Sequence, residues 1–228
     1  MIHDLTDLHI EDAASALRRA GARGVDAYEL KLRQNAPNPT QVINHLSETR
    51  VALMFLGSGA QVTMRDSPDL EIEWLGERFY AEVKQFKWKV QDKLDEAAMR
   101  GSPGEFVVVG DTSQSEGRCS YQQVSDVARK KKGQYVNGAI NVLVIDSESS
   151  GCFDLAETLA GSAAREFDEE VRRAPGDLAL RRLHGIMVIA SWGSAGWNSR
   201  NVGFEKTEHA LPHMSWKLIE AFRSIGQE

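Results

Sequence analysis

Residues 68–84, PDLEIEWLGERFYAEVK, decide the fold of this chain. Apolar and polar side chains alternate on both sides of Gly76-Glu77, with the period of two that is typical of half-buried strands. A two-residue loop with glycine in its first position fits a type II′ turn. The stretch therefore predicts an antiparallel β-hairpin with one buried face.

The position of the turn sets the strand register, and therefore which side chains lie opposite one another. In this register Glu71 faces Glu82 and Asp69 faces Lys84, with all four on one face of the hairpin. Two acids in direct opposition repel, and a divalent cation held by oxygen ligands would remove that conflict. The opposite face is predicted to face the core, and it carries Leu70, Ile72, Trp74, Phe79, Ala81 and Val83.

The charged residues of the hairpin follow a specific spacing. Pro68-Asp69 is separated by twelve residues from Glu82-Val83-Lys84. This pattern resembles the motif of the PD-(D/E)xK nuclease superfamily, which has the restriction-endonuclease-like fold. The resemblance implies that Asp69 and Glu82 bind Mg²⁺, or Mn²⁺ in its place, with help from the Val83 carbonyl. It also implies that Lys84 orients the attacking water and offsets charge on the phosphate.

A helix is predicted from about Thr40 to Leu56, directly before the hairpin. Glu48 lies inside this helix, on the border of its apolar side. The resemblance implies that such a helix supplies an acid to the metal site, and Glu48 matches that place; an ordinary exposed glutamate is the alternative. Asp66 competes with Asp69 as the ligand from the hairpin, but the predicted register favours Asp69.

Two basic stretches are candidates for binding nucleic acid. Residues 85–89, QFKWK, interleave lysines with aromatics, which suits base stacking and backbone contact, although a small apolar cluster at a strand end is the alternative. A helix predicted over residues 121–135 ends in RKKKGQ, where cations also stabilise the helix dipole. The predicted contacts are Lys87, Lys89, Arg129, Lys132 and Gln134. The resemblance implies that a Lys or Gln of this helix reaches the metal site, and the candidates are Gln123, Lys132 and Gln134.

The remaining apolar periodicity predicts helices that alternate with strands. Helices are expected over residues 1–20, 91–99, 155–171 and 214–225, and strands over residues 25–32, 61–64, 106–109, 140–145 and 185–190. The strands at 106–109 and 140–145, with the helix between them, predict a parallel βαβ unit. Residues 192–197 are expected to form a loop, and Trp216 is expected to face inward.

Together these elements predict an α/β fold with a central mixed sheet flanked by helices. The resemblance implies the same architecture, as a restriction-endonuclease-like core. Residues 1–39 are assigned to an N-terminal helical extension and residues 40–228 to the nuclease-like domain. The extension could be an added edge of the domain or a contact in a homodimer.

The composition is that of a globular protein, because 42% of the 228 residues are hydrophobic and 26% are charged. No run of eighteen apolar residues and no secretory signal is present, so a cytoplasmic protein without a membrane partner is expected. The two cysteines lack metal-type spacing, and neither a glycine-rich phosphate loop nor a Gly-x-Ser-x-Gly elbow occurs. The net charge of −6 argues against a broad nucleic-acid surface, although clustered metal-binding acids account for part of it.

These observations predict a metal-dependent nuclease that hydrolyses phosphodiester bonds, with DNA as the expected nucleic acid. Two alternatives stay open: a nuclease-fold protein that binds nucleic acid or protein without cutting, and an unrelated α/β module that binds a partner. The first would take up no divalent cation. The second would not bring together the four predicted catalytic residues, Glu48, Asp69, Glu82 and Lys84.

Overall fold

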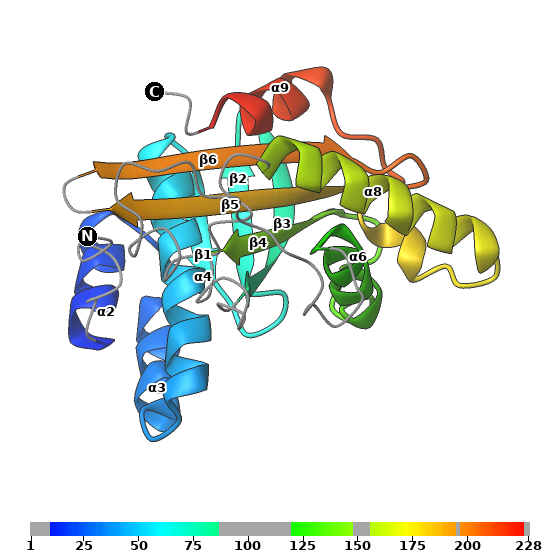
Figure 1. Ribbon diagram of the computed structural model, residues 1–228. Coiled ribbons are helices and arrows are strands. Elements are labelled where there is room, and N and C mark those ends of the chain that lie inside the picture. Colours follow the sequence, from blue (N-terminus) through cyan, green and yellow to red (C-terminus); the bar gives the residue numbers. More distant parts are fainter. Residues whose placement is uncertain (1–9, 87–119, 148–155, 195–196, 226–228) are drawn as a thin grey trace, which may run out of the picture.

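The computed structural model describes residues 10–86, 120–147, 156–194 and 197–225. Within these ranges three helices and three strands come first, and strands are then interspersed with helices toward the C-terminus (Figure 1). In chain order they are α2 (Ile10–Arg19), α3 (Val25–Asn35), α4 (Pro39–Gly57), β1 (Gln61–Met64), β2 (Leu70–Trp74), β3 (Glu77–Phe86), α6 (Ser120–Lys130), β4 (Ile140–Ser147), α8 (Ala156–Arg173), the 3₁₀ turn η2 (Leu180–Arg182), β5 (Gly185–Ser194), β6 (Trp197–Lys206) and α9 (Trp216–Ser224).

Within the described residues, six strands form one mixed sheet in the order β1-β2-β3-β4-β5-β6 (Figure 1). The first three strands are antiparallel neighbours, β3, β4 and β5 run parallel, and β6 returns antiparallel to β5. The chain therefore passes from an antiparallel hairpin into a parallel crossover, with α6 between β3 and β4 in the sequence. The predicted α/β architecture with a mixed sheet is confirmed. The predictions over residues 91–99 and 106–109 lie outside the described residues.

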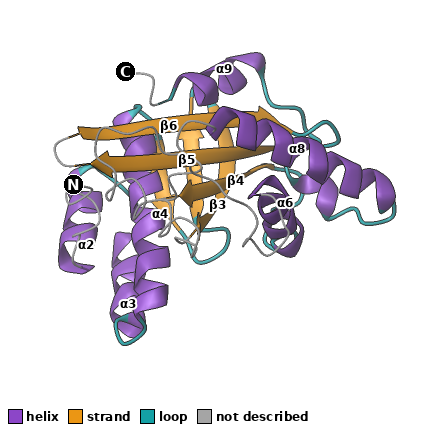
Figure 2. Cartoon of the chain, viewed as in Figure 1, coloured by secondary structure: helices purple, strands orange, loops and turns teal. Residues whose placement is uncertain are grey.

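Helices cover both faces of the sheet, and each face has its own apolar core (Figure 2). Residues of α2, α3, α4 and α9 pack on one face, to which β4 contributes Val142 and Val144. Residues of α6 and α8 pack on the other face, to which β4 contributes Leu143 and Ile145. A parallel strand covered on both sides has no solvent-facing residues, which explains why β4 is buried along its whole length and apolar from Val142 to Ile145.

The predicted hairpin is present, but its turn lies one residue earlier than predicted. Trp74 pairs with Glu77, so Leu75 and Gly76 form the two-residue loop. Both loop residues have positive φ, 56° for Leu75 and 88° for Gly76. Two positive φ values define a type I′ turn, whereas the predicted type II′ turn needs only one.

The change of turn moves the strand register by two residues. Glu71 pairs with Tyr80, so the predicted pairings of Glu71 with Glu82 and of Asp69 with Lys84 are wrong. Glu71 is instead held by two arginines, and the predicted conflict between opposed acids does not arise. An even shift keeps every side chain on its own face, and the six residues predicted to face the core are all buried.

The strand predicted over residues 25–32 is wrong, because this segment belongs to helix α3. Val25, Tyr28 and Leu32 are three and four residues apart, and all three are buried. That spacing is the helical period, and the burial of this stripe against the sheet and α4 outweighs the strand preference of valine and tyrosine.

Several predicted boundaries also differ from the structure. The N-cap of α4 is Asn38 rather than Thr40, and the Asn38 side chain accepts a hydrogen bond from a backbone N–H of the first turn. Part of the loop predicted over residues 192–197 belongs to β5 and β6, which pair with each other up to their last described residues. Trp216 is 69% exposed because it opens α9, ahead of the buried stripe of that helix.

Candidate active site

The candidate active site lies where β3 extends beyond its partner β2. The pairing begins at Leu70, opposite Ala81, so β3 continues without a β2 partner from Glu82 onward. The side chain of Asp69 accepts a hydrogen bond from the Val83 N–H at 2.8 Å. Asp69 therefore satisfies a backbone donor that a longer β2 would have bound, and this contact places its carboxylate beside Glu82.

Helix α4 brings Glu48 to the same place. The Glu48 side chain is only 7% exposed, and its Oε1 lies 2.9 Å from Nδ1 of His45. Its other oxygen, Oε2, lies 3.6 Å from the ammonium of Lys31 on α3. The charge of Glu48 acts on both Asp69 and Glu82, so three of the four predicted catalytic residues lie close enough to interact.

Burial and the repulsion of neighbouring carboxylates raise the pKa values of Asp69 and Glu82. Burial holds the pKa of Asp69 well above its usual value, and the charges of Glu48 and Glu82 add to the rise. Burial likewise raises the pKa of Glu82, and the neighbouring ammonium of Lys131 offsets part of that rise. Buried carboxyl groups with raised pKa values are typical of candidate functional sites. A bound cation would balance their negative charges.

The residue that contacts Glu82 from the α6 side is Lys131. Its Nζ lies 2.6 Å from Oε1 of Glu82, and the helix ends one residue earlier, whereas it was predicted to continue to residue 135. Lys132, a predicted candidate for this place, instead pairs with Asp177. The side-chain oxygen of Gln134, another candidate, is buried and accepts no hydrogen bond from the described residues.

Lys84 and Val83 complete the motif on β3. Lys84 follows Glu82 by two residues, so both side chains project from the same face of the strand. The Lys84 side chain is half-buried, and Val83 packs into the core on the opposite face. The motif thus places one acidic and one basic side chain at the free edge of β3, which is the part of the strand from Glu82 onward that β2 does not cover.

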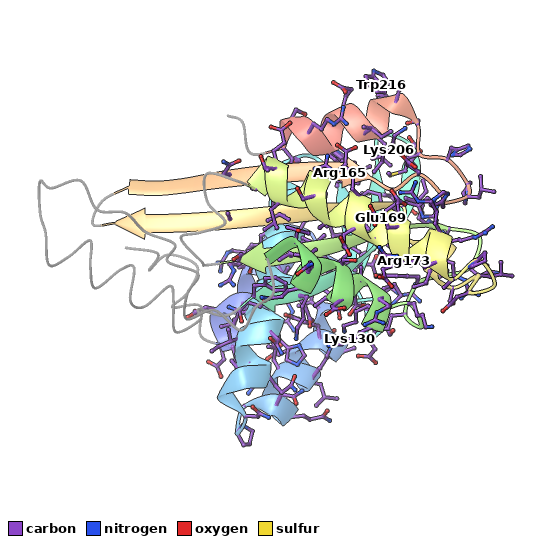
Figure 3. The ribbon with its side chains drawn as sticks, turned by 45° about the vertical axis from the view of Figure 1, so that its right-hand side comes forward. Lys130, Arg165, Glu169, Arg173, Lys206 and Trp216 are labelled. Carbon is purple, nitrogen blue, oxygen red and sulfur yellow. The ribbon has the colours of Figure 1, made fainter. Side chains whose placement is uncertain are left out.

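The outer surface of α6 and α8 carries mixed charge. On α8, Arg173 lies 2.8 Å from both Glu169 and Glu170, and Figure 3 shows Glu169 and Arg173 on the same helix. On α6, the predicted nucleic-acid contact Arg129 pairs with Asp126 at 3.1 Å. Pairs of this kind reduce the positive potential that a phosphate backbone would meet. Two further predicted contacts, Lys87 and Lys89, lie outside the described residues.

The described residues contain no group of three His, Cys, Asp or Glu side chains arranged to hold a metal ion. Two carboxylate oxygens nevertheless lack a hydrogen-bond donor among the described residues. They are Oε2 of Glu48 and Oε2 of Glu82, and both are buried. Buried polar atoms normally have partners, and oxygen ligands of this kind suit Mg²⁺ or Mn²⁺. The residues present fit a divalent cation if Lys31 and Lys131 release their carboxylates.

The sequence did not predict a site role for Lys31, Tyr28, His45 or Lys131. The first two belong to α3, which was predicted to be a strand without chemistry. His45 precedes Glu48 by three residues, and this His-x-x-Glu spacing on one helix face was a usable signal. Lys131 stands in a run of three lysines, and only the point at which α6 ends decides which of them reaches the sheet.

Comparisons of the chain with protein-family models, with curated proteins and with solved structures gave no match. Among the described helices, none combines the length and the apolar character needed to span a membrane.

Proposed function

We propose that this protein is a metal-dependent nuclease of the PD-(D/E)xK type, which hydrolyses phosphodiester bonds in DNA. The observation that carries the proposal is the convergence of Glu48, Asp69 and Glu82, three buried carboxylates, at the free edge of β3. An antiparallel hairpin that leads into a parallel crossover is also the architecture that the sequence resemblance implies. The resemblance and the electrostatics therefore support the same residues.

The site residues have distinct roles in this proposal. Glu48, Asp69 and Glu82 hold Mg²⁺ or Mn²⁺ through their carboxylate oxygens, and the Val83 carbonyl is a further candidate ligand. When bound, the ion polarises the scissile phosphate and lowers the pKa of a coordinated water. Lys84 orients the attacking water and offsets the charge that develops on the phosphate.

Lys131 acts on the ionisation of Glu82. Its ammonium lies 2.6 Å from Glu82 Oε1 and lowers the pKa of this carboxyl against the effect of burial. Metal ligands must be deprotonated, so a neighbouring ammonium keeps Glu82 ready to bind a cation at neutral pH. The same ammonium competes with the cation for Glu82, and its displacement is a step that metal binding must include.

Cleavage of labelled DNA in the presence of Mg²⁺ tests the proposal. Asp69→Asn and Lys84→Met should each lower the cleavage rate by at least about 100-fold, because even the loss of an outer partner of a metal ligand costs 10–100-fold. Glu71→Gln is the matched control, since Glu71 lies on the same hairpin but is held by Arg65 and Arg78. Wild-type activity in both site variants would overturn the proposal.

A second candidate function is a nuclease-fold protein that binds DNA without cutting it. The observation that favours it is the direct Lys131–Glu82 ion pair, which occupies one of the carboxylate oxygens that a metal ion would need. This protein would take up no Mn²⁺ in a calorimetric titration and would still bind DNA. Measurable Mn²⁺ binding by the wild type would rule it out.

A further inference from the structure

Helix α3 delivers a second lysine to the proposed site, from a segment that precedes the motif. Lys31 Nζ lies 3.6 Å from Oε2 of Glu48, and the Lys31 side chain is 23% exposed while that of Glu48 is 7% exposed. Lys31 also lowers the pKa values of Asp69 and Glu82, so its positive charge acts on all three carboxylates. Lys31 is therefore a partly exposed cation beside the buried acids.

A buried anchor holds α3 in this position. The hydroxyl of Tyr28 donates to the backbone carbonyl of His45 and lies 2.9 Å from Oγ1 of Thr49, both on α4. Tyr28 precedes Lys31 by three residues, so the two side chains leave the same face of α3. The position of Lys31 relative to Glu48 is thus fixed by a buried tyrosine and does not depend on the ion pair.

The Lys31–Glu48 ion pair is loose and therefore easily exchanged. Its 3.6 Å separation exceeds the range of a direct N–H···O hydrogen bond, whereas Lys131 approaches Glu82 to 2.6 Å. The four-carbon stem of lysine allows the ammonium to turn to another anion at small cost.

We propose that Lys31 is a phosphate-binding residue of the site, an inference that rests on the proposed function. In the free protein its ammonium neutralises Glu48, whose buried Oε2 accepts no hydrogen bond from the described residues. When a divalent cation takes Glu48, the ammonium is released and binds a backbone phosphate of the DNA. The N-terminal helices then form part of the catalytic unit.

The first test measures the salt dependence of DNA binding. The Lys84→Ala protein keeps its carboxylates, so its affinity for a short labelled duplex can be measured by fluorescence anisotropy in MgCl₂ over a KCl series. Adding Lys31→Met should reduce the slope of log Kd against log[KCl] by about 0.9, the value of one lost phosphate contact. Lys31→Arg should keep the slope, as should Arg33→Met, which removes an exposed cation from the same helix.

The second test measures Mn²⁺ binding to Lys31→Met by calorimetry. Removal of a competing ammonium should tighten Mn²⁺ binding by up to about fivefold, the upper range for a partly exposed ion pair. An unchanged salt slope, or weaker Mn²⁺ binding, would overturn the assignment of Lys31. If the Lys84→Ala protein itself shows no salt-dependent binding of the duplex, the proposed nuclease function fails instead.

Discussion

Asp69→Asn should make the metal-free protein more stable, although it removes a group that the proposed reaction needs. The Asp69 carboxylate is buried beside Glu48 and Glu82, and burial and these charges hold its pKa well above the usual value. Ionisation of Asp69 in the folded protein is therefore unfavourable, because the surroundings disfavour the charge. An amide of the same shape removes the charge and can still accept the hydrogen bond of the Val83 N–H.

The expected size of the effect follows from two opposing contributions. The hydrogen bond to Val83 N–H loses its charge assistance, which costs about 1 kcal/mol. Relief of the desolvation and repulsion of a buried carboxylate contributes about 2–3 kcal/mol. The net gain of about 1–2 kcal/mol corresponds to a rise in Tm of about 4 °C for a chain of this length.

The pH dependence gives the prediction a definite sign. A carboxyl group whose pKa is higher in the folded state stabilises the protein when it is protonated, and that stability is lost as the pH rises through the folded pKa. The advantage of Asp69→Asn over the wild type should therefore be largest at neutral and higher pH. It should shrink as the pH falls toward 3.8, the usual value for Asp.

Thermal unfolding in EDTA, followed by circular dichroism across this pH range, measures the effect. Asp146→Asn is the matched control, since Asp146 is also buried but its carboxylate is 2.9 Å from Nε of the buried Arg50. This substitution should destabilise the protein by about 3 kcal/mol, because it removes the carboxylate that balances the buried charge of Arg50. A lower Tm for Asp69→Asn at neutral pH would refute the reasoning.

Three further predictions concern the anchors of the site. Gly24→Ala should destabilise the protein by more than about 2 kcal/mol in urea unfolding, because φ is 73° and an added Cβ would lie 2.5 Å from the Met64 carbonyl oxygen. In calorimetric titrations, Lys131→Met should move the rise of Mn²⁺ affinity with pH to higher pH. The reason is that this ammonium lowers the pKa of Glu82, which must be deprotonated to bind the ion. Tyr28→Phe should lower the unfolding free energy by about 1–2 kcal/mol in urea, since two buried oxygens on α4 lose their partner.

The predictions for Gly24 and Lys131 each have a control within the same molecule. Gly21 also has positive φ, 86°, but an added Cβ would meet nothing within 4 Å, so Gly21→Ala should cost only about 1 kcal/mol. Lys132→Met removes a neighbouring ammonium that pairs with Asp177, and it should leave the Mn²⁺ profile unchanged. Equal losses at the two glycines, or equal profiles for the two lysine variants, would contradict the assigned contacts. An unchanged unfolding free energy in Tyr28→Phe would remove the proposed anchor of α3.

The hairpin shows how far local sequence patterns lead. Alternation with a period of two predicted which side chains are buried, and this survives any even shift of register. It did not predict the register itself, because a Leu75-Gly76 turn requires positive φ at a leucine, which is uncommon for a bulky residue. The face that carries Asp69 and Glu82 was therefore predicted from the sequence, while their pairing partners were not.

The contacts that complete the site connect segments that are far apart in the chain. Lys131 reaches Glu82 across 49 residues, and Arg50 reaches Asp146 across 96 residues. No local periodicity contains such information, because it depends on which helix covers which face of the sheet and on where that helix ends. For the same reason Lys31 gave no sequence signal, since its neighbour Glu48 lies on a different helix.

Calorimetric titration of the wild-type protein with Mn²⁺ tests the central claim most directly, with Glu82→Gln as the comparison. Buried carboxylates that share a divalent cation predict saturable Mn²⁺ binding by the wild type and a loss of affinity of at least about 100-fold in Glu82→Gln. Absence of Mn²⁺ uptake by the wild type, or equal affinity in the two proteins, would contradict a metal site at the free edge of β3.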